Sequence, residues 1–257
     1  NSTTLTIDDL NMVLASGAAD SATANGAGIT VDGAGATLTY VHAGTKWAFN
    51  KPLDVTGTVV ADSLTITNDS TLNSMTVGRG GGNIDGNTAF GRDALLDNTT
   101  ATSNTAFGAG ALKYTTTGTE NTAVGIGALI LNTTARRSVA VGTGALNYNT
   151  TGYENTAVGF NSNVLNDTGY RNTAVGSKSG LSNVTGNENV SIGYYTNRLG
   201  SSGSYNTALG SRSNHDNVSG SNNTSVGYHA GYDLTGSNNT IIGCISGEAG
   251  ISDTVII

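Results

Sequence analysis

Side chains that could do chemistry are sparse in this chain of 257 residues. Its three histidines, His42, His215 and His229, stand in unrelated sequence contexts, and no catalytic-triad or metal-ligand spacing joins them. Cys244 is the only cysteine, which excludes an intrachain disulfide and a cysteine-cluster metal site. We therefore expect no enzyme activity, no cofactor and no bound metal.

Aromatic side chains offer a different chemistry, because an exposed ring stacks on a sugar and a tyrosine hydroxyl adds a hydrogen bond. Candidates for receptor or glycan binding are the aromatic residues on turns and faces of the repeat described below: Tyr153, Tyr170, Tyr194, Tyr195, Tyr228 and His229. The alternative is that these rings cover corners of the fold or pack against neighbouring chains.

The elements that would position these rings come from one phrase, Asn-Thr-Ala-Val-Gly, which occurs in ten related copies. The copies begin at Asn87, Asn104, Asn121, Ser138, Asn155, Asn172, Asn189, Asn206, Asn223 and Asn239. Successive copies start 17 residues apart, except for the last step, which is 16. A fixed period of this size marks a repeat architecture.

Each repeat, numbered from the first residue of the phrase, has the pattern of a short strand followed by corners. Positions 2 and 4 share parity and face one side of a strand, where pairs such as Val139 and Val141 are apolar. Position 5 is always glycine and position 15 is glycine in most copies, which suits left-handed corners. Stacked copies predict a β-roll or β-solenoid.

Position 17 alternates in charge over five consecutive copies: Glu120, Arg137, Glu154, Arg171 and Glu188. If the copies stack in register, these side chains form one column, in which each pair of opposite charges contributes about 0.2–1 kcal/mol. We expect this column to be structural. Two carboxylates near one groove would suit a glycosidase, so Glu120 and Glu154 leave a polysaccharide-degrading enzyme open as an alternative.

The chain before the repeats divides into two further parts. Residues 1–53 predict a small β unit containing a hairpin, with Tyr40, Trp47 and Phe49 as its core. Residues 54–86 predict a shaft of short strands and a glycine-rich connector, followed by the ten-copy repeat domain at 87–257. The fold class is therefore all-β and elongated.

Charge and hydropathy narrow the partners. The formal net charge is −7 and no basic run could meet a phosphate backbone, so we expect no nucleic acid. No apolar stretch approaches the roughly 20 residues that span a membrane, so we expect no membrane insertion.

The thin core of each repeat predicts self-association. One bulky apolar residue at position 4, beside threonine or valine at position 2, leaves a single coil little to bury. Three chains that pack these stripes against a common axis would supply the missing burial. We therefore predict a parallel homotrimer.

The phrase and its variant Ser138-Val139-Ala140-Val141-Gly142 resemble the head repeat of trimeric autotransporter adhesins, whose heads are trimeric left-handed β-rolls. Separately, residues 21–33 (Ser-Ala-Thr-Ala-Asn-Gly-Ala-Gly-Ile-Thr-Val-Asp-Gly) and 47–55 (Trp-Ala-Phe-Asn-Lys-Pro-Leu-Asp-Val) resemble segments of bacteriophage tail-fibre proteins. Together the resemblances imply a trimeric fibre of the virion tail. Such a fibre contacts other tail proteins and a polysaccharide or outer-membrane receptor on the host cell. A bacterial surface adhesin with the same roll is the alternative.

Overall fold

The structure is a computed structural model that describes residues 18–20, 22–25, 27–31, 36–41, 43, 46–50, 70–72, 75–247 and 249–257. The chain forms two compact units, residues 1–64 and 65–257. The described residues contain strands, turns and one short 3-10 turn but no α-helix, which confirms the all-β prediction for this part of the chain. None of its helical turns is long and apolar enough to cross a membrane. Residues 54–69 of the predicted shaft lie outside the described residues.

The first unit contains a three-stranded antiparallel sheet of β1 (Gly28–Val31), β2 (Ala36–Val41) and β3 (Lys46–Phe49), in that order. The predicted hairpin is confirmed, because β2 pairs with β3 and Tyr40 lies opposite Trp47. The predicted aromatic core is wrong for Trp47 and Phe49, each of which is 51% exposed. A single layer of three short strands buries neither of its faces completely, and these two rings share one face.

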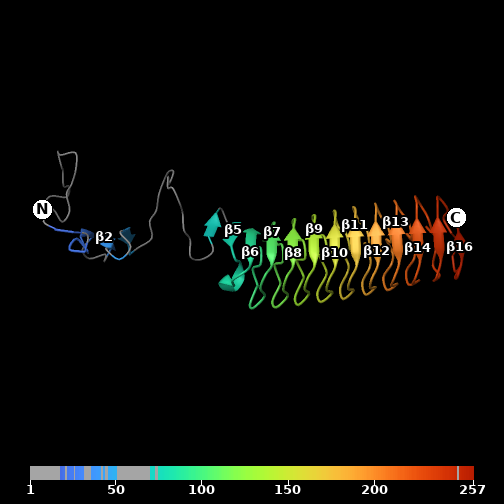
Figure 1. Cartoon of the computed structure of the whole chain (residues 1–257), viewed down its shortest axis with the longest axis horizontal. Helices are drawn as coiled ribbons and strands as arrows, with labels where there is room; N and C mark the ends of the chain where they lie inside the picture. The colour runs from blue at the N-terminus through green and yellow to red at the C-terminus, as the bar shows by residue number, and fades with distance from the viewer. Residues whose placement is uncertain are drawn as a thin grey trace. The chain divides into compact units, whose positions relative to one another are not determined.

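The second unit is one sheet of thirteen strands in chain order, and its coils follow one another along a stack (Figure 1). It begins with β4 (Ser70–Leu72), β5 (Met75–Gly78) and β6 (Thr88–Gly91), which pair antiparallel. The strands that follow are β7 (Thr105–Phe107), β8 (Thr122–Val124), β9 (Val139–Val141), β10 (Thr156–Val158), β11 (Thr173–Val175), β12 (Val190–Ile192), β13 (Thr207–Leu209), β14 (Thr224–Val226), β15 (Thr240–Ile242) and β16 (Val255–Ile256).

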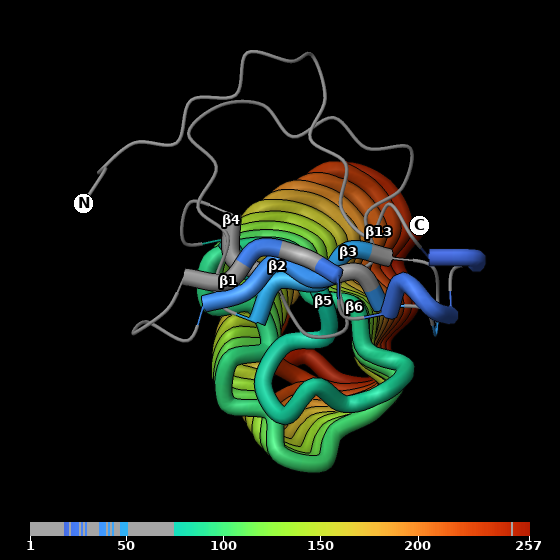
Figure 2. Tube along the Cα trace, turned by 90° about the vertical axis from the view of Figure 1, so that its left-hand side faces the viewer, coloured from blue at the N-terminus to red at the C-terminus, as the bar shows by residue number. Residues whose placement is uncertain are grey.

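From β6 to β16 the pairing is parallel and pairs the same repeat positions, as in Thr156↔Thr173. The predicted β-solenoid is therefore confirmed. We call the repeats coils 1 to 10, from 87–103 to 239–253. β16 belongs to an eleventh, partial copy that begins at Thr254, 15 residues after Asn239. Viewed along the stack, successive coils nearly superpose (Figure 2).

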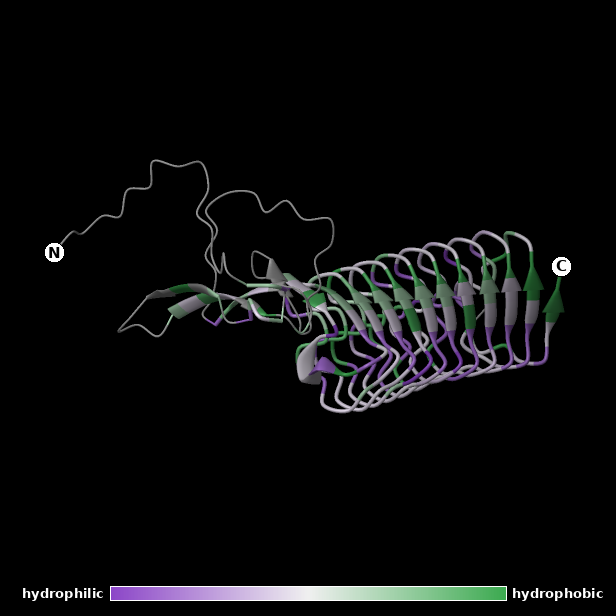
Figure 3. Ribbon diagram, turned by 60° about the vertical axis from the view of Figure 1, so that its left-hand side comes forward, coloured by the Kyte–Doolittle hydropathy of each residue, from purple (hydrophilic) through white to green (hydrophobic). Residues whose placement is uncertain are grey.

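The interior of the solenoid is narrow and filled by small residues. Position 3 points inward, together with positions 8 and 9, and Ala123, Ala128 and Leu129 are 0% exposed. Positions 2 and 4, the apolar parity of the sequence, face outward and are partly exposed. Figure 3 shows green, hydrophobic residues along the arrows of the sheet and purple, hydrophilic residues in the loops that precede them.

Glycines at positions 5 and 15 are required for different reasons. Gly159 at position 5 has a φ of 137°, and a Cβ there would lie 2.5 Å from the carbonyl oxygen of Gly176 in the next coil. Gly152 at position 15 is not left-handed, contrary to the expectation that this glycine makes a positive-φ corner. A Cβ on Gly152 would instead lie 2.2 Å from the carbonyl oxygen of Gly169. Position 15 is therefore small because neighbouring coils approach closely.

Two columns of buried asparagines, at positions 1 and 12, hold the coils together. The Asn172 side chain donates to the carbonyl of Gly186 in its own coil at 2.8 Å and accepts the backbone N–H of Asn189 in the next coil at 3.0 Å. At position 12, the Asn166 amide donates to the carbonyl of Gly169 at 2.9 Å. The six asparagines at position 12 each begin an Asn-X-Ser/Thr triplet, the acceptor pattern for glycosylation, and all are buried: Asn98, Asn132, Asn149, Asn166, Asn183 and Asn217.

The predicted connector forms the first layer of the solenoid. The 3-10 turn η1 (Gly81–Asn83) lies against coil 1, where the Gly81 N–H donates to the carbonyl of Leu95 at 2.7 Å. A Cβ on Gly81 would lie 2.2 Å from the carbonyl oxygen of Leu96. The run of glycines therefore permits a close-fitting cap on the first coil.

Candidate functional site

The densest group of chemistry-bearing side chains lies where the chain turns after each strand. Positions 6, 7 and 10 meet there. In coils 1–3 they line a cavity of about 260 Å³. In coil 4, the Asn147 amide at position 10 donates to the carbonyl of Gly127, at position 7 of coil 3, at 3.1 Å. We call these positions in coils 5–9 the aromatic corner. It comprises Phe160, Asn161, Val164, Ser177, Lys178, Leu181, Tyr194, Tyr195, Arg198, Ser211, Arg212, His215, Tyr228, His229 and Tyr232.

The backbone at position 7 has a left-handed conformation in these coils. Coils 2–4 have glycine there, whereas coils 6–9 have Lys178, Tyr195, Arg212 and His229 with φ between 53° and 58°. A side chain in this region costs about 1–3 kcal/mol. Positions 9 and 17 adopt the same conformation with non-glycine residues, as at Leu129 with a φ of 50° and Glu120 with a φ of 61°.

A continuous series of ring contacts runs through the corner. Tyr194 meets Tyr195 edge-on at 4.5 Å between centroids, and Tyr195 lies 6.3 Å from His215. Tyr232 stacks on His215 at 4.4 Å and on His229 at 4.7 Å. The series ends at Tyr228, whose ring centroid is 4.2 Å from that of His229. The two histidines are therefore joined through one tyrosine.

Cations border the same rings. The Lys178 ammonium donates to the Tyr195 hydroxyl at 2.7 Å and lies 4.9 Å from the centre of its ring. The Arg198 guanidinium lies 5.6 Å from that ring centre. The hydrogen bond with Lys178 lowers the pKa of Tyr195, and the same bond raises the pKa of Lys178. The raised pKa keeps the lysine positively charged.

The histidines have contrasting polar environments. His215 is nearly buried, and its Nδ1 lies 2.5 Å from the Asp216 carboxylate. The Nε2 atom of His229 is buried and meets no hydrogen-bond partner among the described residues. Within that part of the chain, no group of three His, Cys, Asp or Glu side chains could hold a metal ion.

The six predicted binding residues divide between two places. Tyr194, Tyr195, Tyr228 and His229 come together in the aromatic corner. Tyr153 and Tyr170, both at position 16, instead stack on each other at 4.9 Å with an interplanar angle of 3°.

Arginines cover this second pair of rings. The Arg136 guanidinium lies 5.6 Å from the ring centre of Tyr153, and that of Arg171 lies 5.7 Å from the ring centre of Tyr170. These half-buried tyrosines cover a turn of the solenoid, which was the alternative interpretation of the aromatic residues.

The charges at position 17 form an uninterrupted run of ion pairs. Arg137 bridges Glu120 at 3.0 Å and Glu154 at 3.4 Å. Arg171 bridges Glu154 at 3.0 Å and Glu188 at 3.5 Å. The Arg171 hydrogen bond lowers the pKa of Glu154. A glycosidase acid needs a raised pKa, so Glu154 is poorly suited to the role of general acid.

Replacing Glu154 with glutamine is expected to lower stability at neutral pH but not in acid. Because the folded-state pKa lies below the ordinary value of 4.5, the ionised carboxylate stabilises the fold above that value and stops doing so as the pH falls through the folded-state pKa. Thermal melting from neutral to acidic pH measures the effect. The control is Asp233→Asn, an exposed carboxylate with no ion pair among the described residues. Equal pH profiles for the two variants would contradict the prediction.

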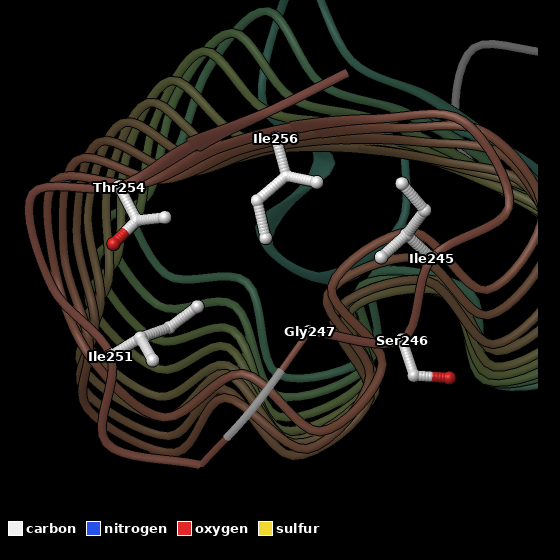
Figure 4. A pocket seen from close by; sticks show the side chains of 6 residues that line it. All are labelled: Ile245, Ser246, Gly247, Ile251, Thr254 and Ile256. Carbon is white, nitrogen blue, oxygen red and sulfur yellow. The ribbon is translucent and has the colours of Figure 1, made fainter.

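The C-terminal end of the solenoid has a cavity of about 370 Å³ lined by Ile245, Ser246, Gly247, Ile251, Thr254 and Ile256. Figure 4 shows Ile245, Ile251 and Ile256 pointing into the space that the last coil encloses. Its lining offers an aliphatic packing surface without titratable groups.

Sequence reasoning missed Lys178, Arg198, Arg212, His215 and Tyr232. The signal was a 34-residue period at positions 6 and 7, where Ser-Lys, Tyr-Tyr, Ser-Arg and Tyr-His follow one another in coils 6–9. Position 10 carries no such signal. Only the turn brings His215 to Tyr195, which is 20 residues earlier.

No family model, curated protein or solved structure matches this chain.

Proposed function

We propose that this protein is a non-enzymatic, rod-like homotrimer of a bacteriophage tail fibre, which attaches to the host cell surface through a glycan receptor. The observation that carries the trimer is the outer sheet face, defined as positions 2 and 4 of β6 to β16. The resemblances of the repeat and of the first 55 residues support a phage fibre. The aromatic corner supports sugar binding, since exposed tyrosines stack on sugar rings.

The outer sheet face is uncharged along its whole length. Its positions hold only threonine, valine, phenylalanine, isoleucine and leucine. Phe107 is 51% exposed and Leu209 is 45% exposed. Eleven rows about 4.8 Å apart, each about 10 Å wide, make an uncharged patch on the order of 500 Å². Position 4 contributes its continuous apolar half, since position 2 is mostly threonine. Contiguous apolar patches above a few hundred Å² mark interaction sites, and an identical stripe on each chain closes into a ring around one axis.

A charge placed on the outer sheet face is expected to dissociate the trimer. Val158, at position 4 of coil 5, is 36% exposed, and burying a lysine there without a partner would be costly. We expect Val158→Lys to reduce the native mass from three chains to one. Leu165→Lys is the matched control, because Leu165 is 39% exposed but at position 11. A wild-type protein with the mass of one chain would contradict the trimer.

An activity assay and the neighbouring genes separate this function from its alternatives. Turnover of capsule or lipopolysaccharide by the purified protein would identify a polysaccharide-degrading tail spike. Genes for other tail proteins beside this gene favour the phage fibre, whereas a bacterial secretion setting favours a surface adhesin. Binding of the labelled protein to whole bacterial cells tests attachment itself, and absence of binding would make the solenoid a spacer.

A further inference from the structure

We propose that the aromatic corner binds a linear acidic polysaccharide that lies along the stack of coils. Sugar rings would pack against Tyr194 and Tyr228, and carboxylates would pair with Lys178 and Arg212. This inference names the receptor class for the proposed attachment function and rests on that function.

The spacing of exposed rings suits a polymer that runs along the stack. Position 6 alternates between an aromatic residue and serine: Phe160, Ser177, Tyr194, Ser211 and Tyr228. The three rings are 50%, 47% and 57% exposed, respectively. Coils about 4.8 Å apart place these rings about 10 Å apart, which is comparable to the length of a disaccharide. Each intervening serine leaves room for a sugar between two rings.

Cations occupy the intervals between those rings. Lys178 and Arg212 follow the two serines, and Arg198 lies on the coil between them. None of the three has an ion-pair partner among the described residues, whereas Arg137 and Arg171 are fully engaged by glutamates.

The corner is therefore locally basic in an acidic protein. Its fifteen positions include no carboxylate, although the whole chain carries a net charge of −7. The adjacent Asp216 is held by His215 at 2.5 Å. Guanidinium and ammonium groups bind carboxylates strongly through charged hydrogen bonds.

The choice of side chain at position 7 supports recognition over a purely structural role. Earlier coils turn the same corner with glycine at position 7, as at Gly127, so the fold itself does not need a long side chain there. Lys178 and Arg212 replace glycine at this strained position, with a φ of 57° in both. The proposal assigns these two cations to ligand carboxylates, to which charged hydrogen bonds are strong.

The test measures binding of the full chain, in its native assembly, to hyaluronan and polygalacturonate oligosaccharides and to their carboxyl-reduced neutral forms. We expect the acidic form of at least one of these oligosaccharides to bind. The affinity for its neutral form should be lower by about 10-fold or more. Arg212→Ser and Tyr194→Ala should each weaken the binding about 10-fold. Binding of neither acid, or equal binding of the acidic and neutral forms, would overturn the proposal. So would tighter binding of an oligothymidylate.

Matched variants test the location. Tyr148→Ala removes a ring that is 49% exposed at position 11, and Arg136→Ala removes a cation from position 16; neither should change affinity. Circular dichroism establishes that all four variants fold. Whole-cell binding with a panel of encapsulated bacteria separates the two proposals. If Arg212→Ser and Tyr194→Ala bind cells as the wild type does, the site proposal fails and attachment stands. If the wild type binds the acidic polysaccharide but no cells, attachment fails and the site stands.

Discussion

Replacing Gly159 with alanine is expected to destabilise the solenoid by about 3 kcal/mol or more, since strain at a left-handed residue and overpacking each cost about 1–3 kcal/mol. The new Cβ would lie 2.5 Å from the carbonyl oxygen of Gly176 and 2.6 Å from its carbonyl carbon. Both atoms belong to the backbone of the next coil, so relief requires the coils to separate locally. Denaturant unfolding followed by circular dichroism measures the loss.

Gly243→Ala is the matched control for this prediction. Gly243 occupies the same position 5 in coil 10 and has a φ of 117°, but the nearest atom to its Cβ is Ile245 Cδ1 at 4.0 Å. We expect this variant to lose only the part due to backbone strain, about 1–3 kcal/mol. Equal losses for the two variants would show that close approach between coils does not explain the invariant glycine.

Replacing Asn172 with alanine is expected to cost about 1–3 kcal/mol, because it leaves the buried backbone N–H of Asn189 unsatisfied. The Asn172 side chain accepts that N–H at 3.0 Å. It also donates to the carbonyl of Gly186 at 2.8 Å, but this carbonyl keeps a second donor, the Asn183 amide at 2.9 Å. The surrounding residues are buried, so solvent does not readily replace these bonds. Chemical denaturation measures the change in the free energy of unfolding.

The opposite substitution can be made in coil 4, the one copy of the ten without asparagine at position 1. Coil 4 has Ser138 at position 1, and its hydroxyl accepts the N–H of Asn155 at 3.3 Å, longer than the link from Asn172. We expect Ser138→Asn to stabilise the protein by about 1 kcal/mol, the usual net value of a buried hydrogen bond. A neutral Asn172→Ala together with a destabilising Ser138→Asn would show that the asparagine column does not stabilise the stack.

The sequence alone predicted the repeat, its strands and its stacking. A 17-residue period with an invariant glycine has few structural solutions, and identical copies in register place equal positions in columns. The ion pairs from Glu120 to Glu188 follow from the same rule, since residues one period apart become neighbours. The period therefore predicts which equivalent positions lie next to each other in adjacent coils.

Contacts between different positions depended on the tertiary structure. Alternation of apolar residues does not say which parity faces inward, and the narrow interior selected the alanine at position 3 over the valine at position 4. Burial of Asn172 became evident only when the turn brought Gly186 to it.

The aromatic corner shows the same division between sequence and structure. The sequence placed Tyr194 and Tyr228 on a common column, two periods apart. The path of the turn decided that His215, Tyr232 and His229 would stack beside that column, because position 10 folds back against position 7. Residues with a left-handed backbone set that path. The type of a non-glycine residue does not predict that it adopts this conformation.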